Sequence, residues 1–171
     1  MRLFFITLIA MSLAACTPAD GDHITRTDIE VLDTLVGVAC RLETREIVSD
    51  LPAAARGSHY GIDLSDRAPR RARWPHEKLC STVRVAHDAA IRAALAEDTQ
   101  QPPPWLGFKA RFDGAATLLR VSLPAYSKDG RRAVVYTSST CPYTCGAGFF
   151  HELVKTPDGW RIAHSDPAWT S

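Results

Sequence analysis

Cys141 and Cys145 are separated by three residues. Of all residues in this sequence, this pair most directly suggests chemistry by its residue type and spacing. A redox pair normally has two intervening residues and lies at a helix N-terminus, which lowers the thiol pKa. A zinc site could add His151 and His164 as ligands, but the spacing fits no finger or ribbon. We therefore favour a disulfide that holds a tight turn between two strands, and we predict no metal site.

The other segments that resemble enzyme motifs are incomplete. His151-Glu152 begins like a zinc metalloprotease motif, but Lys155 stands where the second histidine ligand should be. The sequence Gly146-Ala147-Gly148 lacks the third glycine of a dinucleotide-binding loop, and there is no Gly-x-Ser-x-Gly or Walker A motif. We assign no catalytic residue, expect no cofactor, and favour a non-enzymatic domain over an enzyme.

The N-terminus has the form of a secretory signal peptide over residues 1–15. A positive charge at Arg2 is followed by an apolar run and by Leu-Ala-Ala directly before Cys16. The apolar run is too short to cross a bilayer as a helix. The Leu-Ala-Ala-Cys site resembles a bacterial lipobox, which implies that Cys16 is cleaved at its amino side and carries the lipid. An ordinary signal peptide, with Cys16 as a bystander, is the alternative.

A lipidated Cys16 would decide where the protein resides. Three acyl chains exceed the two signals that stable membrane anchoring needs, and residues 16–24 are polar enough to serve as a tether. Thr17 resembles the second residue of lipoproteins sorted to the outer membrane. We therefore expect a protein anchored in the bacterial cell envelope and facing the periplasm, with the outer membrane favoured over the inner.

Composition limits the partners of the mature chain. Removal of residues 1–15 from the 171 residues leaves 156, which is enough for one domain with a core. Arg2 is the only charged residue removed, so 19 of the 20 basic residues remain against 19 acidic ones. A nucleic-acid partner would need an excess of basic residues. Because the charges of the mature chain balance, we expect no nucleic-acid partner.

An arginine-rich segment is the one candidate contact surface for a protein partner. Four arginines in seven residues precede a tryptophan: Arg67, Arg70, Arg71, Arg73 and Trp74. Arginine and tryptophan are enriched at binding hot spots. A solvated loop whose charges pair with the acidic first helix is the favoured interpretation, and an anionic partner surface is the alternative.

Apolar spacing predicts two helices followed by strands. A capping box at Thr27 and Glu30 begins an amphipathic helix to about Val48. A second helix is expected from Pro75 to about Glu97, with Cys80 in its first turn. Five strands follow, with turns at Asp129-Gly130 and Asp158-Gly159; they are Phe108–Phe112, Leu118–Pro124, Ala133–Ser139, Gly148–Lys155 and Trp160–His164.

This order of elements predicts an α+β fold. We expect one domain over residues 25–171, with two N-terminal helices packed on one face of a C-terminal antiparallel meander of about five strands. After lipidation of Cys16, four cysteines remain for two disulfides, and three connectivities are open. We expect Cys141–Cys145 from proximity in one turn, and Cys40–Cys80 by elimination and because the two helices can face each other.

A stretch of about 35 residues in the C-terminal third, from Val134 to Trp169, resembles the C-terminal region of small exported bacterial lipoproteins of unassigned activity. The matching features are a Val-Tyr strand end, paired cysteines, a Gly-x-Gly, a Leu-x-Lys strand, a Gly-Trp-x-Ile turn and a closing tryptophan. They fall at Val135, Tyr136, Cys141, Cys145, Gly146, Gly148, Leu153, Lys155, Gly159, Trp160, Ile162 and Trp169. The final hairpin is also similar to those of NTF2-like and cystatin-like folds, which is an analogy of fold only.

Three functions remain for such a chain. The favoured one is a lipid-anchored envelope protein with a non-enzymatic binding or accessory domain. The alternative is a periplasmic inhibitor or immunity protein against a secreted toxin or a cell-wall hydrolase, and the weaker alternative is an envelope-acting hydrolase. A protruding charged loop would favour the inhibitor, an enclosed apolar pocket the ligand binder, and a cleft with converging carboxylate and histidine the hydrolase.

Overall fold

The computed structural model describes residues 23–65, 72–75, 79–97, 105–142 and 145–171. The predicted signal peptide, Cys16 and most of the tether lie outside these ranges. No helix among the described residues is both long enough and apolar enough to cross a membrane.

The first helix, α1 (Arg26–Arg41), begins two residues earlier than predicted. Thr25 is its N-cap: the Thr25 hydroxyl accepts from the Asp28 amide at 3.2 Å, and the Asp28 carboxylate accepts from the Thr25 amide at 2.8 Å. The predicted box at Thr27 and Glu30 is therefore wrong, because Asp28 satisfies the cap one turn after Thr25.

The end of α1 was also predicted too late. The helix stops at Arg41, and Glu43 turns the chain with a φ of 54°. The residues expected in its last turn form strand β1 (Glu46–Ser49) instead. Ile47 and Val48 are β-branched and both buried, and a strand places one on each face of the sheet.

The main sheet is mixed rather than a simple meander. Its strand order is β4-β1-β5-β7-β8-β9, and β6 (Ala125–Tyr126) also pairs with β7. Strands β4 (Val83–Ala86) and β5 (Thr117–Val121) both run parallel to β1. The pairs β5–β7, β7–β8 and β8–β9 are antiparallel, where β7 is Arg132–Thr140, β8 is Gly146–Thr156 and β9 is Gly159–Thr170. The antiparallel pairing of β5, β7, β8 and β9 thus agrees with the predicted meander. The parallel strands β1 and β4 were not predicted, and they make the sheet mixed.

One further predicted element is half right and another is wrong. The second helix, α2, ends at Glu97 as predicted but begins only at Asp88, and among its expected first turns the described residues form a loop and β4. The predicted strand at Phe108–Phe112 is instead the short helix α3 (Leu106–Arg111). Phe108 and Phe112 lie four residues apart, a spacing that brings both rings to one side of a helix, where their centroids are 4.8 Å apart.

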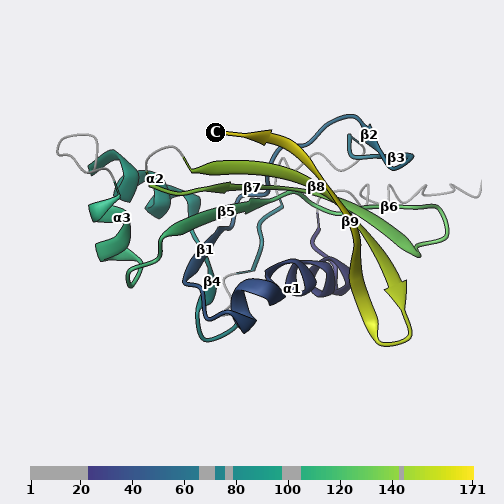
Figure 1. Ribbon diagram of the computed structural model, residues 1–171, viewed down its shortest axis with the longest axis horizontal. Coiled ribbons are helices and arrows are strands. Elements are labelled where there is room, and N and C mark those ends of the chain that lie inside the picture. Colours follow the sequence, from purple (N-terminus) through teal and green to yellow (C-terminus); the bar gives the residue numbers. More distant parts are fainter. Residues whose placement is uncertain (1–22, 66–71, 76–78, 98–104, 143–144) are drawn as a thin grey trace, which may run out of the picture.

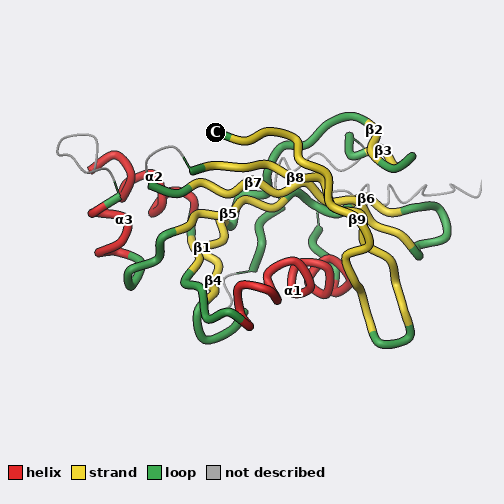
Figure 2. The backbone as a smooth tube through the Cα atoms, viewed as in Figure 1, coloured by secondary structure: helices red, strands yellow, loops and turns green. Residues whose placement is uncertain are grey.

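The helices cover opposite faces of the sheet, which corrects the prediction that both pack on one face (Figure 1). Helix α1 packs with Val48, Val121, Val135 and Leu153 on one face. Helices α2 and α3 pack with Ile47 and Leu118 on the other. The small hairpin of β2 (Ser58–His59) and β3 (Ile62–Asp63) packs on that second face too, against Val134 (Figure 2).

Candidate functional site

Both expected cysteine pairs lie at disulfide distance. The S–S distance is 2.25 Å for Cys40–Cys80 and 1.99 Å for Cys141–Cys145. The first bond ties the end of α1 to the loop before β4, so Cys80 is not in a helix as predicted. The second closes the turn between β7 and β8, where the Cys141 amide also donates to the Cys145 carbonyl. These bonds give the two pairs a structural role in the fold.

The histidines of the alternative zinc site do not converge. His164 pairs with Glu152 across β8 and β9, so the neighbouring His151 points to the opposite face of the sheet. His151 lies 2.9 Å from the Thr137 hydroxyl and 2.7 Å from the Ser165 hydroxyl. Among the described residues there is also no cluster of three or more metal-ligating side chains that could hold an ion.

The Gly-x-Gly of the C-terminal region makes room for a tryptophan. The Trp169 ring crosses β8 so closely that a Cβ on Gly148 would meet its Nε1 at 2.2 Å, and one on Gly146 would meet its Cζ3 at 3.0 Å. The Trp169 indole N–H donates to the Tyr136 hydroxyl at 2.7 Å. Four of the residues that carry the family resemblance therefore form one contact, and their role there is structural.

The arginine-rich segment is only partly described. Arg67, Arg70 and Arg71 lie outside the described residues, whereas Arg73 is exposed. Trp74 is 1 % exposed, and its indole N–H donates to the Val121 carbonyl at 3.1 Å. Trp74 is therefore a core residue and does not present its ring to a partner, which corrects the prediction for this residue.

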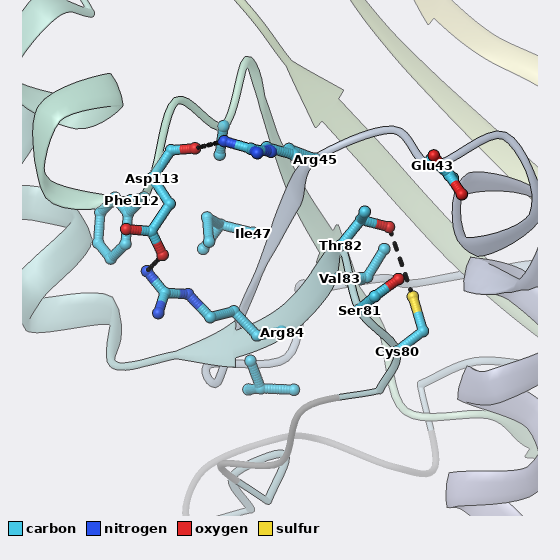
Figure 3. Close-up of a pocket in the computed structure, with 12 residues that line it drawn as sticks. Glu43, Arg45, Ile47, Cys80, Ser81, Thr82, Val83, Arg84, Phe112 and Asp113 are labelled. Carbon is cyan, nitrogen blue, oxygen red and sulfur yellow. Dashed lines mark hydrogen bonds and ion pairs between the residues drawn. The ribbon is translucent and has the colours of Figure 1, made fainter.

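An open hollow lies at the starts of β1 and β4, beside the loop between α3 and β5 (Figure 3). This open pocket, called here the β4 pocket, has a volume of about 780 Å³, within the range of ligand sites in proteins. The α1–β1 loop, the start of β4 and the α3–β5 loop supply its lining. The residues are Glu43, Arg45, Ile47, Cys80, Ser81, Thr82, Val83, Arg84, Val85, Phe112, Asp113 and Ala115.

Two arginines dominate the electrostatics of the β4 pocket. The Arg84 guanidinium lies 3.3 Å from the Asp113 carboxylate and extends over the Phe112 ring. The Arg45 guanidinium donates to the Asp113 main-chain carbonyl (Figure 3). Both arginines keep a large exposed surface, so a ligand can reach them. With Ile47 and Phe112 beside them, the pocket can hold a ligand that carries both an anionic and an apolar group.

Sequence reasoning did not select any of the charged residues of this pocket. They come from three segments that are far apart in the chain, and only the parallel pairing of β1 with β4 and β5 places the starts of these strands together. Asp113 has a φ of 52°, which is uncommon for a residue other than glycine. The Asp113-Gly114 pair after a short amphipathic run was the one local signal of a turn here.

Carboxylates and a histidine converge at the other end of the parallel strands. The Asp50 carboxylate accepts from the Asp88 amide at 2.7 Å and lies 3.2 Å from Nδ1 of His87. Asp88 in turn binds Arg92, Arg120 at 3.3 Å and the Ser49 hydroxyl at 3.2 Å. The Asp50 contacts satisfy the first turn of α2, as a side-chain cap does. These contacts hold the start of α2 against the ends of the parallel strands.

A smaller cavity of about 220 Å³ lies between α1 and the sheet. Apolar residues of α1 form one wall, and Glu46 and His151 lie in the floor. Burial raises the pKa of the Glu46 carboxyl and lowers the pKa of the His151 imidazole. Each shift favours the neutral form, because both groups lose water on folding.

Searches against protein-family models, curated proteins and solved structures found no match to the chain. The site must therefore be interpreted from its own geometry and charge.

Proposed function

We propose that this chain is a lipid-anchored envelope protein whose domain binds a ligand or a protein partner without catalysis. The observation that carries the proposal is the β4 pocket, an open hollow of about 780 Å³ with the exposed guanidinium groups of Arg45 and Arg84 in its wall. The Leu-Ala-Ala-Cys site at the N-terminus supports the anchor. A domain that is held at the membrane by lipid and crosslinked by disulfides fits an accessory role outside the cytoplasm, because disulfides form and persist in oxidising compartments.

A crosslinked pull-down from the native envelope tests the binding role. The lipidated chain is compared with an Arg45→Ala/Arg84→Ala variant and with Arg56→Ala, which removes an exposed arginine of the loop before β2, outside both the pocket and the β8–β9 hairpin. We expect the parent and Arg56→Ala to recover the same partner, and the double variant to lose it. A partner recovered equally by all three would show that the pocket is not the site.

Metabolic labelling with a palmitate analogue tests the anchor separately. The label should enter the parent and be absent from Cys16→Ser, because the thioether at that position is the attachment point. Equal labelling of the two chains would contradict lipidation at Cys16.

The inhibitor function is the second candidate, and the β8–β9 hairpin supports it. Figure 1 shows that the turn of this hairpin projects beyond α1 and the rest of the sheet. Its tip presents Lys155, Pro157, Asp158 and Arg161 to solvent. An inhibitor that inserted this tip into a cell-wall hydrolase would lose its effect in Lys155→Ala/Asp158→Ala and keep it in the pocket variant. Loss in the pocket variant alone would favour the first function.

A further inference from the structure

The cavity between α1 and the sheet, called here the α1 cavity, is enclosed by one helix and five strands. Its floor takes one residue from each of the neighbouring strands β1, β5, β7, β8 and β9. These residues are Glu46, Leu119, Thr137, His151 and Ile162. The volume of about 220 Å³ exceeds that of a cavity of about 150 Å³ that admits benzene. The α1 cavity is therefore large enough for a small organic ligand.

The wall that α1 and its C-cap contribute is apolar and partly open to solvent. Its residues recur at three- and four-residue steps, so they share one flank of the helix; they are Leu35, Val38, Ala39 and Leu42. Val38 is 47 % exposed and Leu42 is 72 % exposed. An apolar ligand that entered the cavity would cover these two side chains, and the burial of apolar surface favours binding.

Glu46 is a polar group of this cavity that lacks a partner. Ile47 packs with α2 and α3 on the other face of the sheet, so the neighbouring Glu46 side chain points toward α1. Within the segments that the structure describes, the Glu46 carboxyl has no ion pair and no side-chain hydrogen bond. Burial alone raises its pKa, because nothing among these segments stabilises the charged form in return. The carboxyl is therefore available to a cation that a ligand brings in.

The histidine of the floor is already engaged. Nε2 of His151 lies 2.9 Å from the Thr137 hydroxyl, and Nδ1 lies 2.7 Å from the Ser165 hydroxyl. Burial lowers the pKa of His151, so its ring is neutral near neutral pH and does not repel a cation. The lining residues include no lysine or arginine. The charge that the cavity offers a ligand is thus the negative charge of Glu46.

We propose that the α1 cavity binds a small alkylammonium ligand, whose ammonium group pairs with the Glu46 carboxylate while its alkyl chain lies between α1 and the sheet. The ammonium group supplies the hydrogen-bond donors that Glu46 lacks, and a charge-assisted bond of this kind is stronger than a neutral one. The inference goes beyond the proposed function, because Glu46 faces α1, whereas Ile47 and Phe112 of the β4 pocket pack on the other face of the sheet.

The experiment uses the mature protein with its disulfides intact, in buffer without detergent, since detergent would compete for an apolar cavity. The ligands are butylamine, hexylamine and octylamine, with hexanol and hexanoate as the neutral and anionic analogues of hexylamine. Isothermal titration calorimetry near neutral pH measures affinity, and NMR shift changes locate the site. The test variant is Glu46→Gln. The matched control is Glu30→Gln, which removes an exposed carboxylate of α1 outside the cavity.

Pairing with Glu46 predicts a distinct pattern for these ligands. Hexylamine should bind about five- to tenfold more tightly than hexanol, and hexanoate should bind more weakly than either. Each further methylene of the amine should strengthen binding about two- to fourfold until the cavity is full. Glu46→Gln should reduce hexylamine to the level of hexanol and leave hexanol unchanged, while Glu30→Gln alters neither. The NMR shift changes should centre on Val38, Leu42 and His151.

Three outcomes would overturn the inference. They are the absence of saturable hexylamine binding, equal affinity of hexylamine for the parent and Glu46→Gln, and shift changes that centre on Arg84 in the β4 pocket. Equal affinity for the two chains would assign the binding to apolar contact without the charge. Each outcome leaves the proposed function intact, because the pull-down with Arg45→Ala/Arg84→Ala tests the β4 pocket separately.

Discussion

Gly148→Ala tests how the closing tryptophan is held on the sheet. The new Cβ would lie 2.2 Å from Nε1 of Trp169 and 2.8 Å from the Tyr136 hydroxyl, so the indole must leave its place over β8. Trp169 is 40 % exposed. Roughly 60 % of a side chain of about 250 Å² is therefore covered, which corresponds to about 4 kcal/mol as an upper bound.

The expected loss of stability comes from the contacts that the Trp169 ring cannot make once it is displaced. Loss of half of the burial removes about 2 kcal/mol, and loss of the indole–Tyr136 hydrogen bond removes about 1 kcal/mol more. Alanine is better than glycine in a strand by about 0.5–1 kcal/mol. We expect Gly148→Ala to lower the free energy of unfolding by about 2 kcal/mol, measured by urea unfolding with the disulfides intact.

Two comparisons separate this explanation from a general intolerance of mutation. Gly37→Ala in α1 places its Cβ no closer than 3.5 Å to Arg41, so it should stabilise the protein by up to about 1 kcal/mol. In a Trp169→Ala background, Gly148→Ala should be close to neutral, because the ring that it displaces is gone. If Gly148→Ala costs the same in both backgrounds, the indole contact is not the reason for the glycine.

Three further predictions concern the core, the disulfides and the pH dependence. Trp160 is 8 % exposed and packs with Tyr126, so Trp160→Ala should cost about 3–5 kcal/mol. Trp160→Phe should cost less, because Nε1 of Trp160 has no hydrogen-bond partner to lose; a melting temperature of Trp160→Ala within a degree or two of the parent would refute this packing. Removal of the Cys40–Cys80 bond, with a separation of 40 residues, should cost about 4 kcal/mol in denaturant unfolding, against about 2 kcal/mol for Cys141–Cys145, with a separation of 4. Equal losses would contradict loop entropy as the cause. Because burial lowers the pKa of His151, the unfolded chain takes up its proton first, so stability should fall as the pH drops through about 6.5. His151→Gln should remove that slope in unfolding curves between pH 5 and 8. Glu46, whose pKa is raised, acts in the opposite direction at lower pH, and an unchanged slope in His151→Gln would assign the effect to another group.

The sequence alone determined the elements whose signals are local. The alternation of side chains and the Asp-Gly turns predicted β7 and β8 within two residues and the start of β9 within one, because both the strand period and the turn conformation are encoded in neighbouring residues. The end of β9 was predicted wrongly at His164, since the strand continues to Thr170 along β8. The body of α1 followed from its apolar spacing. The cysteine pairs at disulfide distance also match expectation, because Cys141 and Cys145 lie in one turn and leave Cys40 and Cys80 as the second pair.

Only the tertiary structure decided the mixed sheet and the candidate site. Short β-branched runs such as Ile47-Val48 and Val83-Arg84-Val85 carry no period long enough to separate helix from strand. They become parallel strands because residues far away in the chain cover both faces. Trp74 was a possible contact residue in the alternative interpretation of the arginine-rich segment, yet its ring is buried and its indole N–H donates to the Val121 carbonyl. The same long-range pairing brings Arg45, Arg84 and Asp113 to one pocket, and no spacing within the sequence encodes their meeting.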